Sequence, residues 1–320
     1  MNKLTFLNGN TIELHYWFND NTHTMDALVF NKCEAEFIAI SKEIIDKLKL
    51  DVEIEVEALA PGGLRSWFKF KQKDLNALKV GVALYVITNV LGSPLTATLD
   101  ELTRQIISKL FDNELVELQE EKEKLELELD LLKLKGEIEQ LSSILDENKI
   151  KKKRSNYYEQ INNCKKIDKL SITVVDDSKN NIFLSKDINK EDFSKFIIKS
   201  DDIEPEENEN AIIEIISPVL KKGKYKWTGI YSGEVINFNM KSSEFKTLVQ
   251  TGKVQFKNGS SINCHLIIKK NINAEGEVKI SGYEVVLVNS YFDNEKPTET
   301  AEGKRKRRKK ENNEKELTLF

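Results

Sequence analysis

The chain has 320 residues, of which 39% are hydrophobic and 32% charged, and its formal net charge is −4. A chain of this length can form two or three domains, and its many charges indicate exposed helices and linkers beside the folded cores. Its three cysteines are far apart and form no CxxC pair, which argues against a disulfide framework or a zinc site and is typical of a reducing cytoplasm.

Residues 1–60 predict a ββαβ module. Apolar runs on both sides of Asn8-Gly9 indicate a β-hairpin, because this dipeptide favours the positive φ angles of a tight turn. From Met25 to Leu48, apolar residues recur every three or four positions, as they do along one side of an α-helix. Residues 51–58 alternate between carboxylates and apolar side chains, which is the pattern of a half-buried strand.

Residues 61–111 combine a chain break, a basic and aromatic segment, and an uncharged stretch. Pro61-Gly62-Gly63 interrupts regular structure, and the cations and aromatics at 65–73 are typical of either a membrane surface or an amphipathic hinge. Residues 80–99 carry no charge, yet only 80–91 is strongly apolar, whereas a membrane-spanning helix needs about 20 apolar residues. A lone membrane span is therefore not expected.

Gly92-Ser93-Pro94 would instead turn the chain into a second helix at 95–111 and so make a helical hairpin. Such a hairpin suits either an oligomeric membrane pore, in which polar groups face protein or water, or a buried position in a protein core. For the pore, the candidate membrane residues are Val82, Tyr85, Val86, Asn89 and Val90.

Residues 112–154 predict a coiled-coil oligomerisation helix. Leucines and an isoleucine between Leu127 and Leu145 recur at steps of four and three, a heptad seam that requires partner helices. A parallel homo-oligomer is the simplest way to supply them, with a tetramer as one candidate. The alternative is a single long helix that packs on its own chain.

Two clusters of cations and aromatics are candidate sites for single-stranded DNA, since cations attract phosphates and aromatic rings stack on bases. One cluster contains Lys151, Lys152, Lys153, Arg154, Tyr157 and Tyr158, and the other contains Lys222, Lys224, Tyr225 and Trp227. For the first cluster, the alternative is that its cations complement a helix C-terminus. For the second, it is a strand with one aromatic core face and one solvated lysine face.

Residues 155–295 predict a mainly antiparallel β region, or two β subdomains joined by the acidic run at 201–210 as a loop. Residues 296–320 predict a disordered tail whose seven consecutive cations at 304–310 are drawn to nucleic acid or anionic lipid. The last residues, Glu316 to Phe320, are similar to peptides that bind bacterial sliding clamps. The alternative is that this apolar end folds back on its own protein as an autoinhibitory peptide. The predicted fold class is α+β.

Taken in order, five features of the chain resemble the effector subunit of the Hailong two-gene antiphage defence system. They are the N-terminal module, the PGGLRSWF hinge, the interrupted apolar stretch, the leucine heptad and the strand-rich half containing SPVLKKGKYKWTGIY. The resemblance implies an effector of bacterial immunity that forms an oligomeric ion channel in the inner membrane, with both soluble halves cytoplasmic. It also implies that single-stranded DNA oligomers, made by a partner nucleotidyltransferase, hold the channel closed and that their loss opens it.

The alternative is a soluble, cytoplasmic, DNA-associated adaptor that uses the basic tail and the C-terminal peptide to reach a sliding clamp. The sequence contains no P-loop, GxGxxG, HExxH or GxSxG motif and no clustered histidines, cysteines and carboxylates. We therefore expect a protein that is not an enzyme, with no catalytic residues, no cofactor and no metal.

Overall fold

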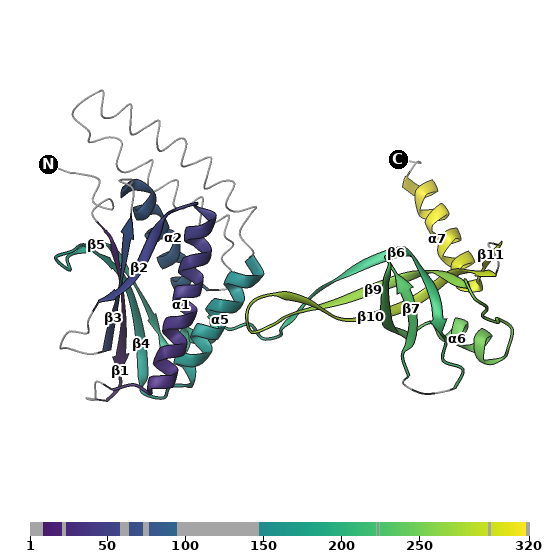
Figure 1. Cartoon of the computed structure of the whole chain (residues 1–320), viewed down its shortest axis with the longest axis horizontal. Coiled ribbons are helices and arrows are strands. Elements are labelled where there is room, and N and C mark those ends of the chain that lie inside the picture. The colour runs from purple at the N-terminus through teal and green to yellow at the C-terminus, as the bar shows by residue number, and fades with distance from the viewer. Residues whose placement is uncertain are drawn as a thin grey trace, which may run out of the picture. The chain divides into compact units, whose positions relative to one another are not determined.

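The computed structural model describes residues 9–20, 24–57, 64–72, 77–94, 147–221, 223, 225–293 and 296–317 (Figure 1). The chain folds as two compact units. Unit 1 takes residues 1–200 together with 274–277, and unit 2 takes residues 201–273 and 278–320.

Unit 1 contains an antiparallel five-stranded sheet in the order β2-β3-β1-β4-β5, with helices between its strands. Its elements in chain order are β1 (Thr11–Phe18), α1 (Ala27–Lys47), β2 (Val52–Glu57), β3 (Leu64–Gln72), α2 (Ala77–Gly92), α5 (Glu147–Asn163), β4 (Ile167–Val175), β5 (Asn181–Asn189) and the 3-10 helix η3 (Lys190–Phe196). The central strand β1 pairs with β3 on one side and β4 on the other.

The core of unit 1 lies on one face of this sheet. Alternation along β1 turns Ile12, Leu14 and Tyr16 into the core, where they pack with α1, α2 and α5. The intervening His15 and Trp17 therefore lie on the opposite face. Helix α1 begins where the Asp26 side chain accepts hydrogen bonds from two backbone N–H groups of the first turn, which otherwise lack partners.

Helix α2, the apolar stretch expected to enter a membrane pore, is part of this core. Val86, Asn89 and Val90 are buried and Tyr85 is half-buried, while the side chain of Val82 lies outside the described residues. The helix has 16 residues, and no helix in the described part of the chain is long and apolar enough to cross a membrane. The second helix of the expected hairpin, 95–111, and the leucine heptad up to residue 146 lie outside the described residues.

Unit 2 is built on strands that close into a ring. Its elements are β6 (Asp202–Ser217), β7 (Trp227–Tyr231), β8 (Glu234–Met240), α6 (Ser243–Gln250), β9 (Ser261–Ile272), β10 (Val278–Asp293), β11 (Lys296–Glu299) and α7 (Ala301–Leu317). Antiparallel β6, β7 and β8 follow one another, β8 pairs in parallel with β10, and β10 and β6 both pair antiparallel with β9.

If β6, β7, β8, β9 and β10 are numbered one to five in chain order, neighbouring strands around the ring follow the order 1-2-3-5-4-1. Helix α6 connects the third strand to the fourth. This is the topology of the OB fold, a closed five-stranded Greek key. Its core gathers Trp227, Phe238 and Phe245 from β7, β8 and α6. Gly229 lets β6 cross β7 closely, since a Cβ there would lie 2.6 Å from the Glu214 carbonyl oxygen.

The expected architecture is wrong. The N-terminal module is not closed on itself, because β1 pairs with β3, expected as a hinge, and with β4, expected in the C-terminal half. The membrane hairpin is not supported by α2, which is a core helix. The β region divides at residue 200 between two units and includes the parallel pair β8 and β10. Residues 301–317, expected as a disordered tail, form α7.

Candidate nucleic-acid interface

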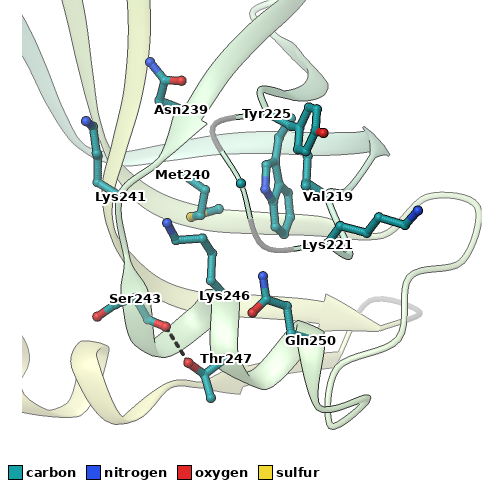
Figure 2. Close-up of a pocket in the computed structure, with 12 residues that line it drawn as sticks. Val219, Lys221, Tyr225, Asn239, Met240, Lys241, Ser243, Lys246, Thr247 and Gln250 are labelled. Carbon is teal, nitrogen blue, oxygen red and sulfur yellow. Dashed lines mark hydrogen bonds between the residues drawn. The ribbon is translucent and has the colours of Figure 1, made fainter.

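Val219, Lys221, Gly223 and Tyr225, from the connection between β6 and β7, line one wall of a pocket on unit 2, and β8 and α6 form the others (Figure 2). The pocket has a volume of about 630 Å³. Its lining residues are Val219, Lys221, Gly223, Tyr225, Trp227, Asn239, Met240, Lys241, Ser243, Lys246, Thr247 and Gln250. We call it the loop pocket.

Capping and burial of α6 set the orientation of its side of the loop pocket. The Ser242 hydroxyl accepts a hydrogen bond from the Phe245 N–H and so begins the helix. Phe245 and Val249 are buried in the core of unit 2, which leaves Ser243 and Lys246 for the outer surface. In Figure 2 the Lys246 side chain extends from α6 toward the space beside Met240.

The loop pocket is positively charged. Three lysines from three different elements line it, namely Lys221 from the connection, Lys241 from the end of β8 and Lys246 from α6, and no carboxylate is among the described lining residues. Hydroxyl and amide groups of the lining add neutral hydrogen-bond donors and acceptors. Such a surface suits a ligand with phosphate groups and polar base or sugar edges.

One lysine of the loop pocket also belongs to an ion-pair network. Lys241 Nζ lies 3.5 Å from Glu284 Oε1, which also pairs with Lys269 Nζ at 2.9 Å. Partial burial alone would raise the pKa of Glu284, but the hydrogen bond from Lys269 and the charge of Lys241 hold it below its usual value. The carboxylate therefore stays ionised at neutral pH, and because two lysines share it, one positive charge is left over.

The two aromatics of the second predicted cluster lie in different environments. Tyr225 is 66% exposed, so its ring is available at the rim of the loop pocket. Trp227 is only 1% exposed, with its ring centroid 5.7 Å from that of Phe256 and 6.2 Å from those of Phe238 and Phe245. Its ring faces are thus occupied by core side chains. Lys222 and Lys224 lie outside the described residues.

The first predicted cluster lies in α5, inside unit 1. Arg154 is buried and its guanidinium donates hydrogen bonds to the carbonyl oxygens of Val90 and Ser93, 3.0 and 2.9 Å away. These groups end α2, so the cation complements the C-terminus of a neighbouring helix rather than of its own. Burial lowers the pKa of Arg154 to about 10, which keeps it charged at neutral pH.

The tyrosines of this cluster are also structural. Tyr157 shares a hydrogen bond of 2.9 Å with the hydroxyl of Tyr16, and Tyr158 donates one of 2.8 Å to the carbonyl of Leu91. Both rings are fully buried, and that of Tyr158 stacks on Phe196 with centroids 4.1 Å apart. Neither offers a free face to a base.

The lysines of the first cluster are distributed around α5. Lys153 lies 3.4 Å from Glu36 of α1, Lys152 is buried, and Lys151 is half-buried. The first predicted cluster therefore belongs to unit 1, and the second belongs to unit 2.

Sequence reasoning missed the residues that complete the loop pocket. Asn239 lies on β8, Lys241 directly follows it, and Lys246 lies on α6. These elements come well after Tyr225 in the chain, yet they line the same pocket. One signal was present. Ile236, Phe238 and Met240 are buried on β8, so alternation places Asn239 and Lys241 on the outer side.

The chain matches no protein-family model, no curated protein and no solved structure.

Proposed function

We propose that unit 2 binds single-stranded nucleic acid at the loop pocket. The observation that carries this proposal is the meeting of Lys221, Lys241 and Lys246 in one pocket beside an exposed Tyr225, with no carboxylate among the described residues that line it. In the OB fold, the second and third strands and the connection between the first two strands form the surface that takes oligonucleotides. The loop pocket shares that connection and the third strand, β8, with this surface, and α6 forms its remaining side.

Each group has a role in this proposal. The three lysines meet backbone phosphates, and Tyr225 stacks on one base, an interaction that contributes roughly 1 to 3 kcal/mol and tolerates any base. Three phosphate contacts to a single strand predict that log K falls with log salt at a slope of about −2. Asn239 and Ser243 add hydrogen bonds to base or sugar groups.

A titration of the full chain with a labelled 12-nucleotide single strand tests the proposal, at two salt concentrations. Lys241→Gln combined with Lys246→Gln should weaken binding by at least tenfold at low salt and reduce the slope by about 1.4, because two phosphate contacts are lost. Tyr225→Ala should weaken binding about 5- to 100-fold with the slope unchanged.

The control variant carries Lys32→Gln and Lys199→Gln, which change the charge equally at exposed lysines of unit 1. It should bind as the unaltered protein does. If the loop-pocket variant binds no more weakly than this control, the loop pocket is not the site. Comparison of DNA with RNA strands then defines which sugar is preferred.

The wider expectations stay predictions. An oligomeric channel of the inner membrane, held closed by DNA oligomers from a partner nucleotidyltransferase, depends on 95–146, which the structure does not describe. The same holds for the clamp-binding peptide of the soluble adaptor, since residues 318–320 also lie outside the described residues. Single-strand binding at the loop pocket is compatible with either.

A further inference from the structure

The start of α7, which carries the basic segment 304–310, is fixed to the strands of unit 2. The Thr300 hydroxyl accepts a hydrogen bond of 2.9 Å from the Gly303 N–H, and Glu302 accepts one of 2.7 Å from the Ser242 hydroxyl. Gly303 lies against the backbone of Asn289, where a Cβ would come within 2.1 Å of the carbonyl oxygen. The start of α7 is therefore fixed on the closed sheet, and the direction of the helix with it.

Only the beginning of α7 is covered by the rest of unit 2. Gly303 is buried and Lys306 is half-buried, 3.1 Å from Glu209. Lys310 lies one turn further along the same side, yet it is exposed, as are all residues from 307 to 312. In Figure 1 the helix accordingly extends away from the strands of unit 2.

The exposed cations of α7 lie on several sides of the helix. An α-helix advances about 100° per residue, so Lys304 and Arg308 share one side, Lys309 lies on a second and Lys310 on a third. Arg307 is held by Glu299 and Glu311, at 3.0 and 3.1 Å. A flat anionic surface or one strand would contact a single side and leave the other cations unused.

A duplex offers phosphates on two sides of a helix. The major groove of B-DNA is about 12 Å wide, and an α-helix with its side chains is about 10 to 12 Å across. A helix lying in this groove therefore has a row of phosphates along each flank. With Lys304 and Arg308 facing one row, Lys310 lies about 200° around the helix and faces the other, and Lys309 lies between them.

We propose that α7 lies in the major groove of duplex DNA and contacts the phosphates of both strands. Helix α6 lies between α7 and the loop pocket, since Ser243 and Lys246 line the pocket while Glu244 forms an ion pair with Arg305. This next step rests on the proposed function: with a single strand at the loop pocket and a duplex at α7, unit 2 selects a duplex that continues into a single strand.

Three probes of equal charge test this inference on the full chain: a blunt duplex, a single strand and a duplex with a single-stranded extension. The variant carries Lys304→Gln, Arg308→Gln, Lys309→Gln and Lys310→Gln, none of which anchors α7. It should lose at least tenfold in affinity for the blunt duplex and reduce its salt slope by about 3 to 4, while single-strand binding is kept. The single substitution Arg308→Lys should preserve duplex binding.

The matched control changes four exposed lysines of unit 1 and carries Lys32→Gln, Lys42→Gln, Lys165→Gln and Lys199→Gln. The extended duplex should bind the unaltered protein at least tenfold more tightly than either simple probe, because two linked contacts act together. Equal duplex affinity of the α7 variant and this control would overturn the inference. So would binding to phosphatidylserine vesicles without binding to duplex, which would make α7 a lipid contact. If the unaltered protein binds the blunt duplex but not the single strand, only the proposed function is overturned.

Discussion

Replacement of Arg154 by methionine separates a structural role of the first basic cluster from a ligand-binding one. The substitution removes two hydrogen bonds to the carbonyls of Val90 and Ser93 and leaves both oxygens buried without their donor. An unmet buried acceptor costs roughly 1 to 3 kcal/mol. Removal of the buried charge offsets part of this cost, because the Nε atom of Arg154 has no hydrogen-bond partner among the described residues. We therefore expect unit 1 to lose about 2 to 4 kcal/mol of unfolding free energy.

Urea unfolding followed by hydrogen exchange and mass spectrometry measures this loss, because peptides of α2 and α5 report unit 1 separately from unit 2. Lys151→Gln is the control, since it removes a half-buried cation of the same cluster and leaves both hydrogen bonds of Arg154 in place. Unit 2 should unfold as before in both variants. Unchanged stability of Arg154→Met, together with weaker single-strand binding, would refute the structural role.

Two further substitutions test the two sheets. The pKa of His15 is lowered to about 4 by burial and then by the charges of Arg65 and Lys169. Between pH 6.5 and 4 the unfolded chain binds a proton that the folded chain does not, so the unfolding free energy decreases by up to about 3 kcal/mol as the pH is lowered. His15→Gln should remove this pH-dependent part of the urea-unfolding profile. Gly229→Ala should destabilise unit 2 by about 1 to 3 kcal/mol, measured as a lower urea midpoint with unit 1 unchanged, because its Cβ would overlap Glu214. An unchanged midpoint would show that β6 can move aside.

Local periodicity predicted elements better than it predicted their arrangement. The apolar spacing from Met25 to Leu48 corresponds to α1, since one stripe of that helix is buried. The position of β1 between β3 and β4 has no local signal, because it depends on pairing between residues as far apart in sequence as Thr11 and Val175. The apolar character of α2 was equally compatible with a lipid or a protein surrounding, and only the packing partners decide between them.

The acidic run 201–210 shows why a strand was missed. Its carboxylates favour a loop when read alone, but in β6 they meet partners from distant segments. Glu206 lies 2.7 Å from Lys270, and Glu207 lies 3.0 Å from His265, both on β9. For the same reason the loop pocket was predicted only in part, since the connection carries the visible lysines while Lys241 and Lys246 arrive from β8 and α6.

The ring of strands in unit 2 also sets the order in which it can fold during synthesis. Strand β6 is made first, yet the ring closes only when β10 leaves the ribosome, since β8 and β9 both pair with it. At about 5 to 20 residues per second, the edge of β6 that pairs with β9 stays unpaired for several seconds, because β9 is made later. The acidic first half of β6 would repel copies of itself on neighbouring nascent chains. The carboxylates that favour a loop when read alone would thus keep unpaired copies of β6 apart.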